Sequence, residues 1–293
     1  MSRKPTLGFI GLGKMGTPMA SALHRAGFAL VVGDLDDKAV AGFVEQHPGA
    51  VAAAGPSSYG EVDVLILMVP NSAVVEAVLE TDGTAAALRP GTLVVDMSSS
   101  VPTRTRTLAA RLATVGLRFV DAPVSGGVRG AVAGKLAVMA GGESSDLDEL
   151  VPVFEPLAST VIAVGPVGSG HAAKALNNLV SAATISVTVE ALQLGRRFGI
   201  TPEILTEVLN SSSGRSNTSE NKVIQFMTSG TFGSGFALQL MAKDVGIAVD
   251  LADDLHQEAE VAHEVARQWS RIAAEVSPET DHTQMYELIG AES

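Results

Sequence analysis

Short apolar runs alternate with helix-length amphipathic segments over the first half of the chain. Each run has the strand-forming character of a buried β-strand, and most are separated by segments long enough for a helix. This rhythm predicts an α/β domain whose mostly parallel, doubly wound sheet is covered by helices on both faces. The predicted strands are 6–10, 29–34, 64–69, 92–97, 117–122, 136–141 and 160–165.

A different pattern begins near residue 168. The segment that follows contains no proline, ends at Gly199 and is rich in Ala, Ser, Thr and Val. It predicts one long helix, about 168–198, that packs on more than one side. Thr201 is placed to cap the next helix, which has proline at its first position. Further helical patterns follow a predicted polar loop at 211–221.

This change of pattern divides the chain into two predicted domains. We expect an α/β domain at 1–166 and an all-helical C-terminal domain at 167–293, which begins with the long inter-domain helix. The boundary falls at "VGPVGSG", where glycines and a proline interrupt the periodic pattern. A chain of 293 residues is long enough for two domains, each with its own core.

Composition limits the partners and the compartment. The net charge is −12 and no run of Lys or Arg forms a basic stripe, so we expect neither a nucleic-acid partner nor a membrane partner. The longest apolar run, 64–70, is short for a membrane span, and glycines interrupt the N-terminus where a signal peptide needs an apolar core. The absence of cysteine excludes disulfides and thiolate metal ligands. We expect a cytoplasmic protein without a metal site.

A glycine-rich turn directly follows the first predicted strand and opens a helix. Its pattern is Gly11-x-Gly13-x-x-Gly16, and Asp34 ends the second strand eighteen positions after the last glycine. Glycines alone can serve only to bend the chain. With the strand, the helix and the acid, they predict a Rossmann dinucleotide-binding domain, in which the backbone approaches the pyrophosphate and the acid binds the ribose hydroxyls. The predicted contacts of the turn are Gly11, Leu12, Gly13, Lys14, Met15, Gly16 and Asp34.

The end of the second strand also bears on which dinucleotide binds. Asp34 repels a 2′-phosphate, and Leu35 supplies no arginine to receive one. The sequence therefore favours NAD as the cofactor, with NADP as the alternative.

A lysine and an amide share one face of the long predicted helix. Gly170, Lys174 and Asn178 are spaced by four in an otherwise apolar segment. Lys174 could simply extend to solvent with its stem packed. If it lies desolvated beside a cationic nicotinamide, its pKa falls from about 10.4 toward neutrality, which suits a general acid/base. Asn177 and His171 lie off this face, and we interpret His171 as structural or peripheral.

Two further segments carry polar groups after apolar runs. "DAPVSGG" (121–127) follows a predicted strand, and its Ser-Gly-Gly turn could bind an anion through backbone N–H groups and Ser125, or could be an ordinary turn. Lys243 and Asp244 follow an apolar helical stretch, where such a pair is usually a surface feature.

Taken together, four motifs resemble those of the β-hydroxyacid dehydrogenase family, which includes 3-hydroxyisobutyrate dehydrogenase, tartronate semialdehyde reductase and 6-phosphogluconate dehydrogenase. In chain order they are "GFIGLGKMGTPMA", "DAPVSGGVRGAVAGKLAVMAGG", "GHAAKALNNLV" and "LMAKDVGIA". The likeness covers essentially the whole chain. It implies a Rossmann domain, an inter-domain helix and an all-α domain that contributes to a homodimer or homotetramer.

The resemblance also assigns roles to residues. It implies that Lys174 is the catalytic lysine, that Asn178 contacts the substrate and that Lys243 lines the site near the nicotinamide. The substrate carboxylate would bind at Ser125, Gly126 and Gly127. The implied cofactor contacts at strand ends are Val69, Pro70, Asn71 and Ser98.

One position departs from the family pattern. After Gly-Arg-Ser, the 3-hydroxyisobutyrate enzymes tend to carry an aromatic residue, and this chain has Asn217. An apolar methyl group would lose its wall there, whereas a hydroxylated substrate would gain a partner. The resemblance is therefore as consistent with a more polar hydroxy acid as with 3-hydroxyisobutyrate.

We therefore expect a hydride-transfer enzyme that oxidises a small 3-hydroxy carboxylate to its semialdehyde with NAD, using Lys174 as general acid/base. Within enzymes, the alternative is an NADPH-dependent reductase of a small aldehyde acid, such as tartronate or succinate semialdehyde. Outside enzymes, the alternative is an NAD(H)-binding sensor or tethering protein that kept the fold and lost catalysis. The presence of Lys174 and Asn178 argues against the last alternative.

Overall fold

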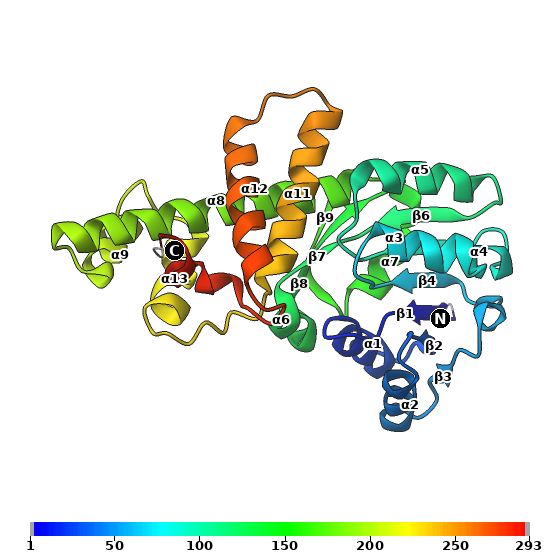
Figure 1. Cartoon of the computed structure of the whole chain (residues 1–293). Helices are drawn as coiled ribbons and strands as arrows, with labels where there is room; N and C mark the ends of the chain where they lie inside the picture. Colours follow the sequence, from blue (N-terminus) through cyan, green and yellow to red (C-terminus); the bar gives the residue numbers. More distant parts are fainter. Residues whose placement is uncertain (1–2, 291–293) are drawn as a thin grey trace. The chain divides into compact units, whose positions relative to one another are not determined.

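The hydrophobic pattern changes near residue 168, and the fold changes with it (Figure 1). A computed structural model describes residues 3–290 as two units, the first ending at Lys174 and the second beginning at Ala175. The first contains the sheet, and the second is helical. One helix, α8 (Ser169–Phe198), runs through the division. The predicted fold class is confirmed.

The sheet of the first unit has the order β3-β2-β1-β4-β5-β6-β8-β7, with β9 paired to β8. Its strands are parallel except where β8 meets β6 and β7. Each predicted strand forms, and the sequence pattern missed only β3 and β7, which at two residues each are too short to appear as apolar runs. The strands are β1 (Thr6–Ile10), β2 (Ala29–Gly33), β3 (Val51–Ala52), β4 (Val64–Leu67), β5 (Leu93–Asp96), β6 (Arg118–Asp121), β7 (Val124–Ser125), β8 (Leu136–Gly141) and β9 (Ala158–Gly165).

Alternate residues of the central strands face two separate hydrophobic cores. In β4, Val64 and Ile66 pack with the cluster under α1, α2 and α7, whereas Leu65 and Leu67 pack with the cluster under α3, α4 and α5. All four side chains are buried, and burying an aliphatic side chain contributes about 1.5–3 kcal/mol. The helices of this unit are α1 (Gly16–Arg25), α2 (Asp37–Gln46), α3 (Ser72–Glu76), α4 (Thr84–Ala87), α5 (Pro102–Ala113), α6 (Gly127–Ala133) and α7 (Ser144–Phe154), with shorter turns η1 (Pro56–Tyr59) and η2 (Ala77–Thr81).

The second unit packs its helices around one face of α8. Ile185, Val189 and Leu192 of α8 are fully buried in a cluster that also contains Trp269, whose indole N–H donates to Ser186 Oγ at 3.0 Å. Its further elements are α9 (Pro202–Asn210), α10 (Asn217–Asn221), η3 (Val223–Met227), α11 (Leu238–Asp254), α12 (Glu260–Glu275), η4 (His282–Gln284) and α13 (Met285–Leu288).

The prediction of a loop at 211–221 is wrong in its second half, because α10 forms there. Ser216 caps this helix: its hydroxyl accepts from the N–H of Ser219, and the Ser219 hydroxyl accepts from the N–H of Ser216. This reciprocal pair stabilises a helix of only five residues whose sequence is otherwise polar.

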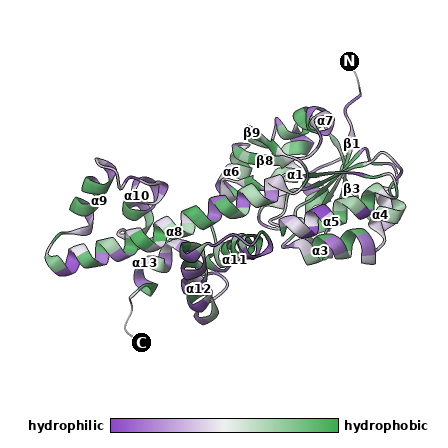
Figure 2. Ribbon diagram, turned by 90° about the horizontal axis from the view of Figure 1, so that it is seen from above, coloured by the Kyte–Doolittle hydropathy of each residue, from purple (hydrophilic) through white to green (hydrophobic). Residues whose placement is uncertain are grey.

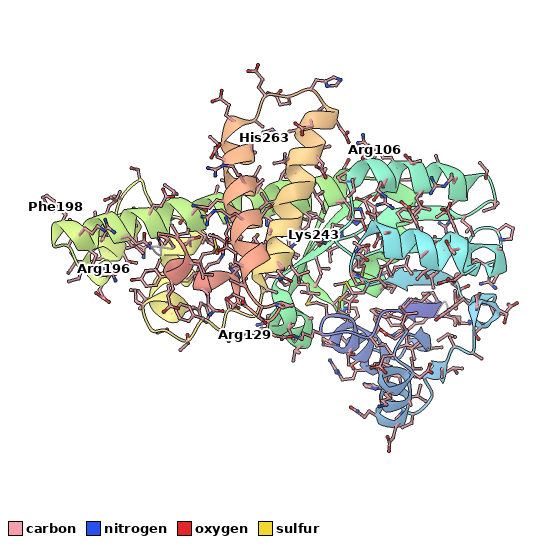
Figure 3. The ribbon with its side chains drawn as sticks, in the orientation of Figure 1. Arg106, Arg129, Arg196, Phe198, Lys243 and His263 are labelled. Atoms are coloured by element: carbon pink, nitrogen blue, oxygen red, sulfur yellow. The ribbon has the colours of Figure 1, made fainter. Side chains whose placement is uncertain are left out.

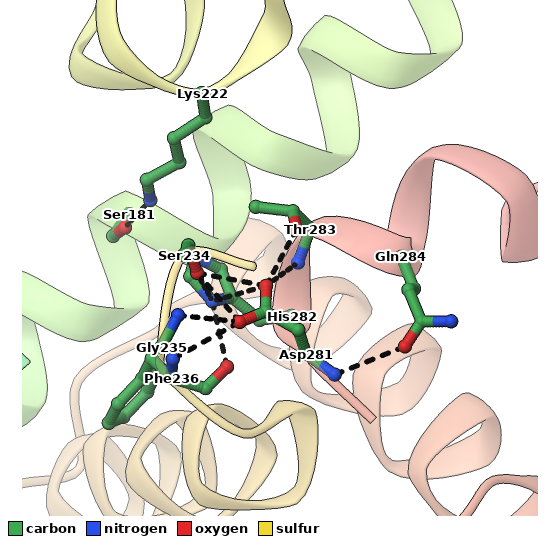
Figure 4. Close-up of polar contacts among 9 residues, drawn as sticks. All are labelled: Ser181, Lys222, Ser234, Gly235, Phe236, Asp281, His282, Thr283 and Gln284. Carbon is green, nitrogen blue, oxygen red and sulfur yellow. Dashed lines mark hydrogen bonds and ion pairs between the residues drawn. The ribbon is translucent and has the colours of Figure 1, made fainter. Parts of the chain in front are cut away.

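A buried carboxylate joins two distant segments of the second unit (Figure 4). Asp281 accepts hydrogen bonds from the N–H groups of Gly235 and Thr283, at 2.8 and 2.9 Å, and from the Ser234 hydroxyl. Burial alone would raise the pKa of Asp281, but these hydrogen bonds, first of all those from Thr283, hold it below its ordinary value. The carboxylate therefore fastens 234–236 to the start of η4.

The same cluster contains a histidine and a lysine whose pKa values are lowered. His282 is 3% exposed, and burial, reinforced by the nearby Lys222 ammonium, lowers its pKa to about 4. Lys222 donates to Ser181 Oγ at 3.1 Å, and burial lowers the pKa of its ammonium to about 8 although Asp281 opposes the shift. The histidine is therefore neutral at physiological pH.

Within the described residues, α8 is the one helix long and apolar enough to span a membrane by length and composition. Of its most apolar window, 44% is buried inside the protein, and long core helices of soluble proteins pass the same criterion. Figure 2 shows hydrophobic residues along much of α8.

Candidate active site

The glycine turn between β1 and α1 is held to the end of β2 by one carboxylate. Asp34 Oδ2 accepts from the N–H of Leu12 at 2.6 Å, and Oδ1 accepts from the N–H of Asp36 at 2.9 Å. Gly11 has a φ of +105°, which favours glycine, and a side chain on Gly16 would overlap the Gly11 carbonyl oxygen. Two of the three glycines are therefore required by the fold itself.

Gly13, the remaining glycine of the turn, and the start of α1 are suited to binding an anion. A Cβ on Gly13 would meet no atom within 4 Å, so the fold does not require a glycine there. Met15, the N-cap residue of α1, makes no side-chain cap, and the first turn contains no acid. Backbone N–H groups at such a helix start bind phosphate, so this turn fits a dinucleotide pyrophosphate. Lys14 lies in the same turn and forms interactions of its own.

The other predicted cofactor contacts lie beyond the carboxyl ends of β4 and β5. The N–H of Val69 donates to Ser98 Oγ at 3.0 Å, so these two strand ends are joined. Pro70 follows Val69, and Asn71 then caps α3 by accepting from the N–H of Val74 at 3.1 Å. Because β1 lies between β2 and β4, this edge is where the strand order reverses, the usual dinucleotide site of a doubly wound sheet.

The predicted substrate turn lies at the other end of the sheet, where β7 leads into α6. Ser125 pairs with Ala137 of β8. Gly126 and Gly127 follow with φ values of +125° and +59°, which side-chain-bearing residues rarely adopt. The turn therefore needs its glycines.

The helix that carries Lys174 begins against the same strand, β8. A Cβ on Gly170 would overlap the carbonyl oxygen of Met139 in β8, so helix and strand backbones are in direct contact. Lys174 follows one turn later and is 7% exposed. The substrate turn and the start of α8 thus both rest on β8 within the first unit.

Asp121, at the end of β6, is directed toward the start of α8. Its Oδ1 accepts from the N–H of Gly168 at 2.6 Å and its Oδ2 from the N–H of His171 at 2.8 Å. The side chain is completely buried. Burial raises the pKa of Asp121, although the neighbouring His171 and the backbone N–H donors oppose the shift.

His171 lies between two buried carboxylates. Its Nδ1 is 2.8 Å from Thr105 Oγ1 and 3.7 Å from Asp121 Oδ2, and its Nε2 is 3.6 Å from Asp96 Oδ2. Asp96 in turn accepts from Ser100 Oγ at 2.8 Å. The ring is 1% exposed, which is the environment of a structural residue.

Asn178, one turn beyond Lys174 on α8, is fixed by two neighbours. Its Nδ2 donates to Asp244 Oδ2 at 2.6 Å, and its Oδ1 accepts from Asn177 Nδ2 at 3.1 Å. Lys243 on α11 (Figure 3) lies 3.2 Å from the other oxygen of Asp244. Asn177 was interpreted from its spacing as pointing elsewhere, but the structure makes it a partner of Asn178.

Asn217 is the first residue of α10 and is exposed, whereas the adjacent Thr218 and Ser219 are buried. Over residues 3–290, no three His, Asp or Glu side chains gather closely enough to hold a metal ion.

Sequence reasoning missed the partners of the functional side chains. Asp121 was noted only as the first residue of "DAPVSGG" and Asp244 only as the neighbour of Lys243. The sequence feature that could have indicated a role for Asp121 is its position at the end of a predicted strand, just before a glycine-rich turn that leads into a helix. Which helix start such an acid caps is decided by the tertiary fold.

The dinucleotide-type turn, the strand-end contacts and the buried lysine define an NAD(P)-binding oxidoreductase. A family model described as the NAD binding domain of 6-phosphogluconate dehydrogenase matches residues 6–165. A second, described as "NAD-binding of NADP-dependent 3-hydroxyisobutyrate dehydrogenase", matches residues 168–289. The chain belongs to the β-hydroxyacid dehydrogenase family.

Named relatives agree with this assignment. The 2-(hydroxymethyl)glutarate dehydrogenase of Eubacterium barkeri is 38% identical over 252 residues, which cover 85% of this chain and 83% of the relative. The NAD-dependent L-serine dehydrogenase of Pseudomonas aeruginosa is 40% identical over 253 residues, with coverages of 84% and 85%. The solved structure of Mycobacterium tuberculosis 3-hydroxyisobutyrate dehydrogenase with L-serine is 32% identical, has a TM-score of 0.92 and covers 99% of this chain and 100% of that chain.

The protein is therefore an NAD(P)-dependent 3-hydroxyacid dehydrogenase, as the sequence predicted. The alternative of a protein that kept the fold without catalysis has no support in these relatives, which are named dehydrogenases.

Proposed function

We propose that the enzyme oxidises a small, polar 3-hydroxy carboxylate to the semialdehyde with NAD, and that Lys174 takes the proton. The observation that carries the proposal is the placement of Lys174. It is an almost fully buried lysine on a helix that starts against β8, the strand that also supports the Ser125 turn. Burial disfavours the charged ammonium relative to the neutral amine, and the neutral amine is the form that can accept a proton.

The proposed site residues have distinct roles in this reaction. The Ser125 hydroxyl and the N–H groups of the following turn bind the substrate carboxylate. Lys174, as the neutral amine, accepts the proton of the carbinol hydroxyl. NAD held by the 11–16 turn and Asp34 would supply the acceptor for the hydride that leaves the carbinol carbon. Asn178 Nδ2 carries two hydrogens, one of which is donated to Asp244, so the second is available for the substrate hydroxyl.

The preference for NAD rests on the end of β2. The Asp34 carboxylate is fixed by Leu12 and Asp36, so it cannot swing away from a 2′-phosphate without losing both hydrogen bonds. Leu35, which is 93% exposed, provides no positive charge in compensation. An NADPH-dependent reductase of an aldehyde acid is the competing proposal, and kinetics with both cofactors in both directions separate the two.

The choice of substrate rests on polarity. Asn217 stands where the 3-hydroxyisobutyrate enzymes tend to have an aromatic residue, and it is exposed as the first residue of α10. This favours hydroxylated or amino-substituted 3-hydroxy acids over 3-hydroxyisobutyrate. A panel of glycerate, serine, threonate and 3-hydroxyisobutyrate tests the order.

We also propose that the enzyme is a homodimer or homotetramer. Val180, Val187 and Leu194 of α8 are 63%, 61% and 69% exposed, and their seven-residue spacing places them along one side of the helix. Phe198, at the end of the same helix (Figure 3), is 87% exposed. An apolar stripe of this kind is typical of an interface. Light scattering of wild type and Val187→Glu tests it, and a monomeric wild type would contradict it.

Lys174→Met is the decisive test of the proposed chemistry. Methionine keeps the apolar stem and removes the proton acceptor, so we expect kcat to fall by about 10²- to 10⁴-fold while NADH still binds. Lys38→Met, at an exposed lysine of α2, is the matched control and should leave kcat unchanged. Full activity of Lys174→Met would reject Lys174 as the acid/base.

A further inference from the structure

The first residue of the substrate-turn motif does not serve the turn. Asp121 begins "DAPVSGG", yet both of its carboxylate oxygens accept hydrogen bonds from the backbone at the start of α8, from Gly168 and His171. The carboxylate is fully buried, and two charge-assisted bonds of 2.6 and 2.8 Å satisfy it. It is thus a helix cap supplied by a distant strand.

This cap works together with direct backbone packing. A Cβ on Gly141, at the end of β8, would lie 2.6 Å from Asp121 Oδ1 and 2.9 Å from the nitrogen of Gly170. A Cβ on Gly170 would lie 2.8 Å from the carbonyl oxygen of Asp121. Strand ends and helix start therefore meet with no side chain between them, and a small displacement of either produces a clash.

A second contact holds the start of α8 against the neighbouring helix α5. His171, in the first turn of α8, has its Nδ1 2.8 Å from the hydroxyl of Thr105, and that hydroxyl lies within hydrogen-bonding distance of the Val101 carbonyl oxygen. The start of α8 is thus connected to the ends of β6 and β8 and to α5. Contacts on several sides fix the direction of the α8 axis as well as the position of its first turn.

We propose that Asp121 is a positioning residue for Lys174. This inference rests on the proposed role of Lys174 in proton transfer. Lys174 lies three residues beyond His171, less than one helical turn from the last backbone group that Asp121 accepts from. Any tilt of the helix start therefore moves the Lys174 amine relative to the Ser125 turn. Proton transfer requires hydrogen-bonding distance, and a misplacement of about 1 Å can cost about 10²-fold in rate.

Asp121→Asn is the sharpest variant, because it keeps the volume of the side chain. One carboxylate oxygen becomes an NH₂ group, which faces a backbone N–H and cannot accept from it. Gly170→Ala is a second variant that keeps the Asp121 carboxylate itself. Its Cβ would overlap the carbonyl oxygen of Met139 and lie 2.9 Å from Asp121 Oδ2, so it pushes the helix start off the ends of β8 and β6. Asp146→Asn is the matched control: Asp146 is a buried acid in the first turn of α7 and is paired with Arg118 at 2.8 Å, away from α8.

The experiment measures kcat, the KM for the best hydroxy acid of the panel, the Kd for NADH, and the solvent deuterium isotope effect on kcat. For Asp121→Asn and Gly170→Ala we expect kcat to fall by about 10²-fold, the NADH Kd to stay unchanged and the isotope effect to rise, because proton transfer becomes rate-limiting. Asp146→Asn should lower thermal stability without changing the isotope effect.

The outcomes separate this inference from the function on which it rests. If Lys174→Met is inactive while Asp121→Asn keeps the wild-type kcat and isotope effect, Asp121 is only a structural cap and the inference is overturned. If both variants at 121 and 170 lose kcat in parallel with NADH affinity, general disorder explains the loss and the inference is again overturned. If Lys174→Met keeps full activity, the proposed function itself fails, whatever the behaviour of Asp121.

Discussion

The side-chain amide of Asn178 donates a 2.6 Å hydrogen bond to the carboxylate of Asp244. Both side chains are buried, at 4% and 2% exposure, and they come from two sequence motifs that lie far apart in the chain. The bond sets the amide so that its nitrogen faces the carboxylate and its oxygen faces Asn177. The orientation of the predicted substrate amide is therefore decided by an acid that belongs to another helix.

Asp244→Asn should weaken catalysis without touching the cofactor turn. The variant exchanges a charged acceptor for a neutral amide that can flip, so Asn178 loses its fixed orientation. Hydrogen bonds to charged groups are worth about 1.5–3 kcal/mol, which corresponds to roughly a 10- to 100-fold fall in kcat/KM. Steady-state kinetics with the best hydroxy acid measures the fall.

Asn177→Ala is the companion variant, because it removes the neutral bond to the other end of the same amide. It should cost only a few-fold, since a neutral bond contributes about 1 kcal/mol. Equal losses in the two variants would mean that Asp244 does not orient Asn178.

Gly13 and Gly16 should respond in opposite ways to alanine. Gly16→Ala should destabilise the protein by about 2–3 kcal/mol, because its Cβ overlaps the Gly11 carbonyl oxygen. Gly13→Ala should leave stability unchanged, because a Cβ there meets no atom within 4 Å and its φ is not left-handed. It should instead weaken NADH binding by about tenfold or more, because the backbone must approach the pyrophosphate.

Thermal unfolding and NADH fluorescence titration check the two effects in each variant. Normal NADH affinity in Gly13→Ala would show that the open space beside Gly13 is not where the dinucleotide binds.

The end of β2 should control cofactor choice. Replacing Asp34 by Ser and Leu35 by Arg removes a repelling charge and adds a phosphate-binding one, so the ratio of kcat/KM for NADP to that for NAD should rise by about 10²-fold. Absolute activity should fall as well, because Asp34 also holds the N–H of Leu12. Leu35→Arg alone, which keeps the carboxylate, should shift the ratio much less; an equal shift would make Asp34 irrelevant to the choice.

His282 should make the protein sensitive to acid. Burial lowers the pKa of His282 to about 4, so between its ordinary value of 6.5 and pH 4 the unfolded chain binds the proton that the folded protein refuses. Unfolding free energy should therefore fall as pH drops through this window, by an amount on the order of 2–3 kcal/mol. The lowered pKa of Lys222 affects the pH dependence of the unfolding free energy only between about pH 8 and its ordinary value of 10.5, where the unfolded chain still holds the proton that the folded protein has lost.

His282→Asn should flatten this part of the profile, because asparagine can still donate to the Phe236 carbonyl oxygen but does not titrate. Denaturant unfolding at several pH values between 4 and 7 measures the slope. His263→Asn is the control: His263 is exposed, and its hydrogen bond to the Ala259 carbonyl raises its pKa, so its loss should not reduce the acid sensitivity. A wild-type slope in His282→Asn would contradict the assignment.

Periodic and local features of the sequence predicted most of this fold. The central strands are continuous apolar runs because their alternate residues fill two separate cores, as in β4, and such runs are visible in the sequence. The glycine turn is equally visible, because Gly11 and Gly16 are required by backbone geometry. Lys174 and Asn178 could be paired because four residues make about one helical turn.

Features that depend on long-range contacts could not be predicted. Helix α10 was missed because its capping box uses serine at the third position, where the recognisable pattern has Glu or Gln. The roles of Asp121 and Asp244 depend on which helix start and which amide fold against them, and a carboxylate on its own does not indicate its partner.

The cap at Asp121 also limits how this protein can exchange parts with its relatives. The family model that covers the sheet ends at residue 165, but the backbone groups that Asp121 accepts from belong to Gly168 and His171. A recombination event at the model boundary would leave a carboxylate buried against a foreign helix start, at a cost of several kcal/mol if its donors are displaced. A crossover at this boundary should therefore be tolerated only where the incoming helix start places its backbone N–H groups within hydrogen-bonding distance of the Asp121 carboxylate.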